Sequence, residues 1–196
     1  EQAPCIRTIW VHNDMEREIA AKKNPSRPLL SRAYRTYDHV IPVGADICPA
    51  VERIGRHPAN IQVIANYMDI DNIRQRASKP VDFDSETQST VSLTTLRNVL
   101  SGSERKFINI GRYSPEKGHK RLLKAFDRFW TNHQDTWLIV IGGMGTLYES
   151  TCEFAGALSC SDHVILLKSM TNPMPVLVSC DFFILSSFYE GQVLVV

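Results

Sequence analysis

The sequence lacks a long hydrophobic run, a strong net charge and paired cysteines. No apolar stretch approaches the roughly 20 residues that a bilayer-spanning helix needs, and no signal peptide is visible. The 196 residues carry a net charge of only +1, from 22 basic and 21 acidic side chains, so no global field favours nucleic acid as a partner. The five cysteines are odd in number, scattered and without a C-x-x-C pair. These absences predict a cytoplasmic protein with reduced thiols, in which any cationic site is local.

Spacing suited to metal ligands is also missing. The six histidines are dispersed, and none forms an H-x-x-x-H pattern or has a cysteine close by. Asp82-Phe83-Asp84 is a D-x-D pattern that can hold a metal with a nucleotide, but it follows Pro80 in a polar stretch. No G-x-S-x-G elbow supports a Ser-His-Asp set. We therefore predict neither a bound metal nor a cofactor.

What the sequence does contain is enough apolar residues for a core, 43% of the chain, in alternating strand and helix patterns. In the first part, strands are expected at 6–11, 39–43 and 61–64, and helices at 15–23, 27–36 and 46–54. This alternation predicts right-handed crossovers and a parallel sheet. The helix at 27–36 is basic, with Pro28 in its first turn. Such a face suits an anionic membrane surface, although solvated basic faces are common.

The later part repeats the alternation. Strands are expected at 107–110, 137–141, 163–167 and 182–185, with helices between them. The polar stretch 67–105, with helices expected at 70–77 and 93–100, predicts a connection between two domains.

The turn after the strand at 107–110 carries two cations. Gly111-Arg112 follows the strand, the chain turns at Ser114-Pro115, and a helix is expected to open at Glu116, Lys117 and Gly118. Amides at a helix start, with a guanidinium and an ammonium beside them, make a site for a multiply charged anion such as a diphosphate. The alternative is an ordinary strand-to-helix turn with surface charges.

A glycine-rich turn follows the next strand. Gly143 and Gly145 form a G-x-G that permits close backbone approach to a ligand, but Tyr148 stands where a third glycine would be. This departure argues against a dinucleotide cofactor.

Two motifs together resemble a known family. Gly-Arg followed by Glu-Lys-Gly, and later a Ser-x-x-Glu-Gly that ends at Gly191, resemble the donor-binding half of family 4 retaining glycosyltransferases of GT-B fold. Three further stretches extend the resemblance over most of the chain: Trp10-Val11-His12, Tyr37-Asp38-His39-Val40-Ile41 and Val63-Ile64-Ala65-Asn66-Tyr67-Met68-Asp69.

The resemblance implies an α/β, GT-B-like fold with two Rossmann-type parallel-sheet domains, both incomplete. Residues 1–66 would end an amino-terminal acceptor domain, 67–105 would connect, and 106–196 would form a truncated donor domain. The chain does not begin with Met and stops inside an apolar run, so we expect a fragment that binds a nucleoside diphosphate weakly and is inactive alone.

The implied reaction moves a sugar, typically a hexose, from a nucleoside diphosphate sugar to a hydroxyl with retention of configuration. The acceptor would be a glycan, a lipid-linked molecule or a polyol, as in cell-surface polysaccharide or glycolipid synthesis. Arg112 and Lys117 would stabilise the leaving diphosphate in place of a metal. No protein nucleophile is implied. Peripheral contact with the inner face of the membrane fits such acceptors.

The remaining site residues have roles by resemblance or by chemistry. His12 would contact the sugar or its phosphate, and Lys168 would lie near the base; a surface histidine that ends a strand is the alternative for His12. Glu190 can accept hydrogen bonds from two sugar hydroxyls, and the amides of Gly191 and Gln192 can reach a phosphate or the sugar. The family's second glutamate would fall eight positions after Glu190, beyond Val196.

Other functions remain open. An epimerase or phosphorylase of the same fold would use similar phosphate-binding cations, so Gly111, Arg112 and Lys117 do not separate these activities from transfer. A nucleotide-binding module without catalysis is the other alternative.

Overall fold

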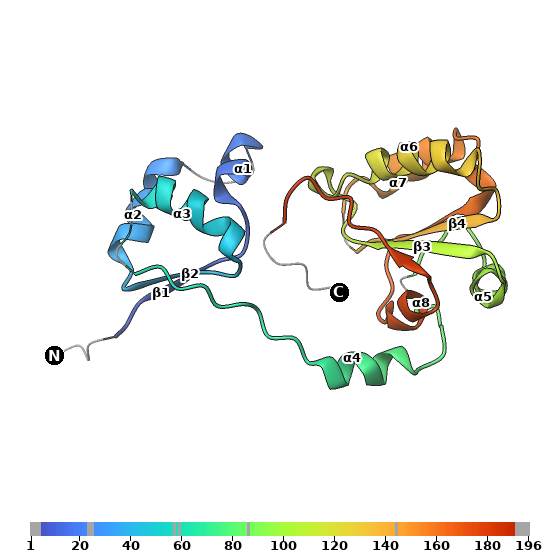
Figure 1. Ribbon diagram of the computed structural model, residues 1–196, viewed down its shortest axis with the longest axis horizontal. Helices are drawn as coiled ribbons and strands as arrows, with labels where there is room; N and C mark the ends of the chain where they lie inside the picture. Colours follow the sequence, from blue (N-terminus) through green and yellow to red (C-terminus); the bar gives the residue numbers. More distant parts are fainter. Residues whose placement is uncertain are drawn as a thin grey trace. The chain divides into compact units, whose positions relative to one another are not determined.

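The computed structural model describes residues 5–22, 26–56, 58, 60–85, 87–143 and 145–190. The chain forms two compact units, one made of Glu1–Met68 with Tyr189–Val196 and the other of Asp69–Phe188. Each unit contains a parallel sheet (Figure 1), so the predicted α/β class is confirmed.

In the first unit, β1 (Thr8–Val11) and β2 (His39–Pro42) pair in parallel, with Thr8 opposite His39. Figure 1 shows α1 (Met15–Ala20), α2 (Arg27–Thr36) and α3 (Cys48–Gly55) on one side of these strands. A 3-10 turn, η1 (Ala45–Ile47), precedes α3. The core between helices and strands consists of Val11, Tyr34, Val40, Val43, Ile47, Val51 and Ile54.

The third strand predicted at 61–64 is reduced to a single parallel bridge between Val40 and Ile61. Backbone hydrogen bonds still run from Gln62 N to Val40 O and from Ile64 N to Pro42 O, at 3.1 Å each. The bond that would lie between them needs an N–H at Pro42, and proline has none. This missing donor explains why residues 61–64 do not form a regular strand beside β2.

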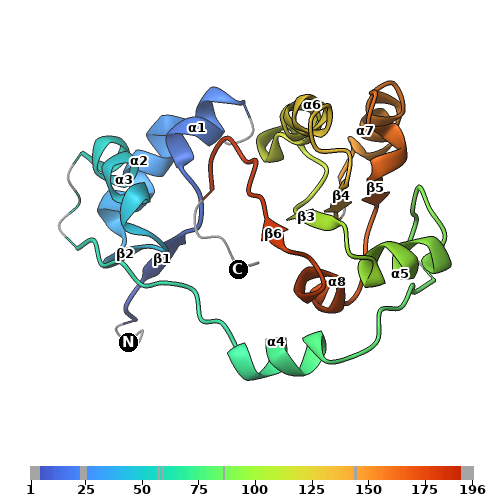
Figure 2. The same ribbon diagram turned by 45° about the vertical axis from the view of Figure 1, so that its right-hand side comes forward.

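The second unit is a three-layer α/β structure. Its strands are β3 (Arg105–Ile110), β4 (Thr136–Ile141), β5 (Val164–Leu167) and β6 (Phe182–Phe183), in the order β5-β4-β3-β6, all parallel. Figures 1 and 2 show α6 (His119–Trp130) and α7 (Tyr148–Gly156) on one face of the sheet. α5 (Leu93–Ser101) and α8 (Met174–Val178) cover the other face.

Both faces of this sheet are covered by helices, and the strands are mostly apolar, as is usual in parallel sheets. Leu138 and Val140 of β4 point toward α6 and α7, whereas Ile139 and Ile141 point toward α5 and α8. Leu122, Leu123 and Phe126 of α6 recur at helical spacing and fill the first of these layers. A short 3-10 turn, η3 (Ser161–His163), leads into β5.

The polar stretch before β3 packs on the second unit. α4 (Ile70–Ala77) lies against α8, and Arg76 Nη2 donates to the Thr171 carbonyl at 2.6 Å. Further on, Ser89 forms an antiparallel bridge with Leu167, flanked by hydrogen bonds from Thr90 N to Leu166 O and from Lys168 N to Gln88 O. This segment therefore lies along the outer edge of β5.

The D-x-D pattern takes part in the same packing. Asp84 Oδ2 accepts hydrogen bonds from the Thr171 amide at 2.8 Å and the Thr171 hydroxyl at 2.6 Å. Asp84 is thus a structural link between the connecting stretch and the loop after β5. Among the described residues, no three His, Cys, Asp or Glu side chains gather in a group that could hold a metal ion.

The five cysteines are free thiols. Burial raises the pKa of Cys160 and of Cys180 to about 12. None of the described helices is long and apolar enough to cross a membrane.

Candidate functional site

The two sequence motifs meet at the carboxyl edge of the second unit's sheet. β3 and β6 are parallel neighbours, with Phe107 opposite Phe182, so the turns that follow them leave the same edge. Beyond β6, Ile184 N still donates to Ile108 O at 2.8 Å, and Asn109 Nδ2 donates to Ile184 O at 2.7 Å. This edge is where parallel α/β sheets bind their ligands.

The turn after β3 differs from the predicted helix start. Pro115–Lys117 form a 3-10 turn, η2, and Gly118 adopts a left-handed conformation with φ of 67° before α6 begins at His119. The left-handed residue interrupts helical geometry, which is why Glu116 and Lys117 are not in the helix. The expectation that α6 opens at these residues was wrong.

Gly118 is also the contact point between the two motifs. A Cβ added at Gly118 would lie 2.5 Å from the Ser186 carbonyl oxygen. Next to it, Ser186 Oγ donates to Lys117 O at 2.7 Å, and Phe188 N donates to Glu116 O at 2.7 Å. The loop after β6 is therefore seated directly on the turn after β3.

Arg121 of α6 supports this loop from beside it, a role that sequence patterns did not indicate. Its Nη2 donates to the carbonyls of Ser186 and Ser187, and its guanidinium lies over the Phe188 ring at 4.3 Å from the centroid. Contacts of a cation with carbonyls and an aromatic face fix the segment that leads toward Glu190.

Arg112 is an exposed cation that is held by an ion pair at one of its terminal nitrogens. Its Nη2 lies 3.5 Å from Glu116 Oε1, and the Arg112 side chain is 65% exposed whereas Glu116 is buried. Ser114 Oγ donates to the same Glu116 oxygen at 2.6 Å. Glu116 thus fixes the turn and orients the guanidinium, while most of the Arg112 side chain is exposed to solvent.

Lys117 lies beside Gly111 and is partly buried. A Cβ added at Gly111 would come within 3.4 Å of Lys117 Cδ. The glycine therefore gives room to the lysine stem, and the strand end, the guanidinium and the ammonium share one turn.

The glycine turn after β4 is shaped by Tyr113. This side chain is fully buried, and its hydroxyl lies 3.2 Å from Val140 O and 3.1 Å from Leu167 O. A Cβ at Gly142 would lie 2.1 Å from Tyr113 Cδ2, and one at Gly145 would lie 2.4 Å from Tyr113 O. Those two glycines are needed for packing rather than for a ligand.

Gly143 has different surroundings. A Cβ added there would meet only Arg112 Cγ, at 3.9 Å. Of the glycines in this turn that the structure describes, Gly143 is the one whose position leaves space next to Arg112, which fits its predicted place beside a ligand.

Lys168 follows β5 at the same edge of the sheet. Its Nζ lies 3.0 Å from Gln88 Oε1 and 3.4 Å from Glu149 Oε1, and it is 5.4 Å from the centroid of the Tyr148 ring. The cation is therefore held by neighbours from two other segments of the chain, Gln88 and the first turn of α7.

The other predicted residues belong to the first unit. His12 directly follows β1, is exposed, and its ring stacks on Trp10 at 6.1 Å between centroids and 16° between planes. Within the same unit, the Arg17 guanidinium lies over the Tyr189 ring at 5.8 Å, so the residue before Glu190 contacts the helix that follows His12. Gly191 and Gln192 lie outside the described residues.

His119 is the buried titratable group next to the turn. It is 4% exposed, its ring centroid lies 4.8 Å from that of Tyr113, and it hydrogen-bonds the Gly111 backbone. Burial, reinforced by the charge of Lys117, lowers the pKa of His119 from 6.5 to about 4. Nε2 has no hydrogen-bond partner within the described chain.

This shift predicts acid sensitivity of the turn. The unfolded chain binds a proton at His119 near pH 6.5, whereas the folded chain does so only near pH 4. Stability is therefore lost as pH falls from about 6.5 toward 4, by about 2 kcal/mol between pH 7 and pH 5. Urea unfolding at both pH values should show this loss in the native chain and its reduction in His119→Gln. Equal losses in the two proteins would contradict the assignment.

A parallel α/β sheet with cations at its carboxyl edge is an arrangement that suits a phosphorylated ligand. Comparison with known proteins gives the family. Residues 96–196, more than half of the chain, match the family model described as Glycosyl transferases group 1. The chain belongs to this family.

Two curated relatives agree with this family. The chain is 28% identical over 130 residues to an uncharacterized glycosyltransferase of Methanocaldococcus jannaschii, covering 66% of the chain and 29% of the relative. It is 23% identical over 164 residues to N-acetylgalactosamine-N,N'-diacetylbacillosaminyl-diphospho-undecaprenol 4-alpha-N-acetylgalactosaminyltransferase of Campylobacter jejuni, covering 83% of the chain and 39% of the relative. The chain thus spans 29% and 39% of the lengths of these proteins.

Solved structures show the fold. An alpha,alpha-trehalose-phosphate synthase (UDP-forming) from Burkholderia vietnamiensis aligns over 96% of this chain and 47% of its own, with a TM-score of 0.70 and 16% identity. S. aureus TarM aligns over 95% of this chain and 33% of its own, with a TM-score of 0.68 and 15% identity. The predicted GT-B-like α/β fold is confirmed, and the predicted resemblance is confirmed at the level of a glycosyltransferase.

Proposed function

We propose that this chain is part of a family 4-type retaining glycosyltransferase, comprising the end of its acceptor domain and much of the donor-binding domain, and that the enzyme takes a sugar, in the first instance a hexose, from a nucleoside diphosphate sugar. One observation carries the proposal: the turn with Arg112 and Lys117 is seated directly against the loop that leads to Glu190, through Gly118 and Ser186. Cations for a diphosphate therefore lie on a turn that contacts the segment preceding Glu190, the predicted ligand of the sugar hydroxyls.

The cation pair suits a leaving diphosphate. Arg112 has a mostly exposed side chain, one terminal nitrogen of which pairs with Glu116, and Lys117 lies on the same turn. A guanidinium can hold two phosphate oxygens at once, and an ammonium adds a compact charge. Positive charge oriented before the reaction stabilises the negative charge that develops on the diphosphate as the glycosidic bond breaks.

The sugar and base would be bound by the remaining predicted residues. In this proposal Glu190 accepts hydrogen bonds from sugar hydroxyls, the Gly191 and Gln192 amides and His12 contact the sugar or its phosphate, and Lys168 lies near the base. The C. jejuni relative is named for a diphospho-undecaprenol-linked sugar. This name favours a lipid-linked glycan as acceptor and peripheral contact with the inner face of the membrane.

The test is a binding screen of UDP, GDP, ADP and CDP against the chain, followed by incubation of the full-length protein with the corresponding sugar nucleotides. We expect one diphosphate to bind clearly more tightly than its nucleoside. Failure of all four to bind would overturn the proposal. Conversion of a sugar nucleotide to its epimer without any acceptor would assign the same site to an epimerase instead.

Donor binding should not require a divalent metal. Arg112 and Lys117 supply the positive charge that a metal supplies elsewhere, so adding EDTA should change the affinity for the preferred nucleoside diphosphate by less than about twofold, a difference below about 0.4 kcal/mol. Isothermal titration with and without EDTA measures this directly. Binding that appears only with Mn²⁺ or Mg²⁺ would contradict the role of the cation pair.

A further inference from the structure

A pocket of about 410 Å³ in the first unit is lined by four arginines. It lies between α2 and α3, and none of its described lining residues is acidic. The lining consists of Arg27, Pro28, Ser31, Arg35, Arg53, Ile54 and Arg56. This pocket belongs entirely to the first unit, whereas Arg112 and Lys117 belong to the second.

Helix geometry brings these side chains to one place. Arg27, Ser31 and Arg35 recur every four residues of α2 and therefore share one face of that helix. Arg53 and Arg56 are three residues apart at the end of α3. The two helices pack through a core that includes Tyr34 and Ile54, so the two sets of guanidiniums border the same pocket.

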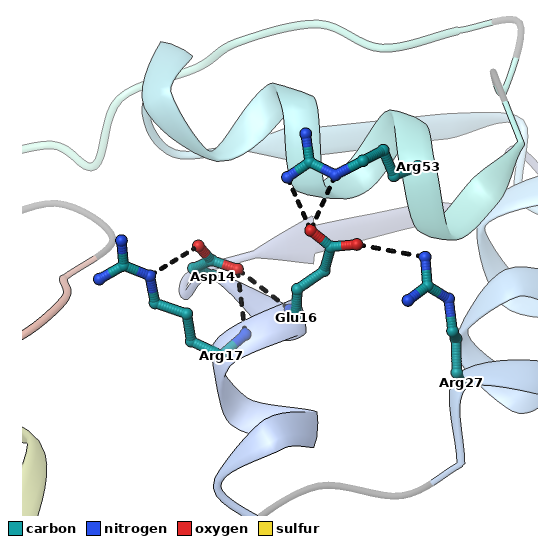
Figure 3. A network of polar contacts seen from close by, with 5 residues as sticks. All are labelled: Asp14, Glu16, Arg17, Arg27 and Arg53. Carbon is teal, nitrogen blue, oxygen red and sulfur yellow. Dashed lines mark hydrogen bonds and ion pairs between the residues drawn. The ribbon is translucent and has the colours of Figure 1, made fainter.

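One carboxylate holds two of the arginines in position (Figure 3). Glu16 Oε1 accepts from Arg27 Nη2 at 3.1 Å, and Glu16 Oε2 accepts from Arg53 Nε at 2.8 Å and Arg53 Nη2 at 2.6 Å. The Arg53 hydrogen bond keeps the pKa of Glu16 below its usual value. A single carboxylate thus orients guanidiniums from two helices but offsets only one of the four positive charges.

The other two arginines are not neutralised within the described residues. Arg35 Nε donates to a backbone carbonyl, that of Ser31, at 3.2 Å. Arg56 is exposed and makes no ion pair with a described carboxylate. Like charges collected around one cavity repel one another, and an anion in the cavity removes that repulsion.

Two of the arginines also occupy positions where another type of residue is usual. Arg27 occupies the first turn of α2, which contains no acidic residue although the helix dipole favours one there. Arg56 has φ and ψ of 56°, a left-handed position after a helix where glycine is the usual residue. Side chains placed against such preferences indicate a role beyond folding.

We propose that this pocket binds a phosphate-bearing ligand. Guanidiniums form paired hydrogen bonds with phosphate oxygens, and Glu16 already sets two of them in place before the ligand arrives. The phosphate could belong to a free phosphorylated molecule or to the headgroup of a lipid. This inference does not depend on the function proposed for the second unit.

The first experiment reads each arginine separately. Phenylglyoxal, which modifies exposed arginines, is applied with increasing inorganic pyrophosphate, and the modified peptides are quantified by mass spectrometry. We expect pyrophosphate to protect Arg35 and Arg56. Arg32, an exposed residue of α2 outside the pocket, is the matched control and should be modified at an unchanged rate. Equal protection of Arg32, or no protection of the pocket arginines, would overturn the proposal.

Variants test whether the arginines act together. In Arg35→Gln, the pyrophosphate concentration that protects Arg56 should rise about 10-fold, whereas Arg32→Gln, with the same change of charge on the same helix, should leave it unchanged. Arg56→Gly should raise the thermal midpoint because glycine suits the left-handed position, yet weaken protection of Arg35. The same protection of Arg35 in Arg56→Gly and in the native chain would contradict the proposal.

A second set of ligands separates the two sources of phosphate. Glycerol phosphate and phosphatidylglycerol vesicles are compared at equal phosphate concentration, with phosphatidylcholine vesicles as the zwitterionic control. Stronger protection by the anionic vesicles assigns the pocket to a lipid headgroup, and stronger protection by glycerol phosphate assigns it to a free molecule; both support a phosphate site. Protection by none of them, with none by pyrophosphate, would refute it.

Discussion

Replacing Arg112 and Lys117 together with alanine should weaken binding of the preferred nucleoside diphosphate by about 100-fold, because each removes a charge-assisted contact of about 1.5 kcal/mol or more. Arg112 already pairs with Glu116 at 3.5 Å and is largely solvated, so its single replacement should have the smaller effect. Lys117 is partly buried, so replacing it alone should weaken diphosphate binding more than replacing Arg112 alone. Titration calorimetry with the diphosphate measures the affinity of the double variant and of each single variant.

The control lies at the other end of β3, the strand that precedes this turn. Arg105 is exposed at the first position of β3, at the opposite end of the sheet from Arg112. Arg105→Ala therefore removes an equal charge far from the proposed site and should leave the affinity within about twofold. Binding of the nucleoside without its phosphates should also be unchanged in the double variant. An equal loss for nucleoside and diphosphate would mean that the substitutions disturb the fold rather than a phosphate contact.

Gly118→Ala should lower the stability of the second unit by about 2–4 kcal/mol and should weaken diphosphate binding as well. Two costs add at this position: alanine disfavours φ of 67°, and its Cβ would lie 2.5 Å from the Ser186 carbonyl oxygen. The backbone at Ser186 must then move, and the loop that leads toward Glu190 moves with it. Urea unfolding and nucleotide titration report the two effects.

Gly156 is the matched control for this change. It is the last residue of α7, and a Cβ added there would meet nothing within 4 Å. Gly156→Ala should therefore be neutral or stabilising by up to about 1 kcal/mol, since alanine favours the helix. If Gly118→Ala were as harmless as Gly156→Ala, the close seating of the two motifs at Gly118 would be wrong.

The strands of the second unit could be predicted because each is a short apolar run that ends in glycine, serine or a charged residue. The strand predicted at 137–141 corresponds to β4, which begins one residue earlier, at Thr136. The strand predicted at 163–167 corresponds to β5, which begins one residue later, at Val164. The strand at 182–185 was expected to be longer than β6, although Ile184 still hydrogen-bonds β3. Apolar runs show where strands lie, whereas strand ends depend on neighbours that are distant in sequence.

The turns were harder to predict because their shapes depend on tertiary contacts. Gly118 is left-handed and so displaced the expected helix start, and only the structure shows the Ser186 carbonyl that excludes a side chain there. Gly142 and Gly145 were part of an apparent ligand turn, yet they make room for Tyr113. The roles of Arg112, Lys117, Lys168 and Glu190 as ligand contacts remain predictions that the binding experiments test.

The segment along the outer edge of β5 has a consequence for how the second unit is synthesised. Leu166 N donates to Thr90 Oγ1 across a separation of 76 residues, and the covering segment comes first in the chain. During translation the segment around Ser89 and Thr90 leaves the ribosome well before β5 and is unpaired until β5 emerges. Once β5 emerges, its unpaired edge can be covered at once, so the interval in which that edge could recruit a neighbouring nascent chain is short.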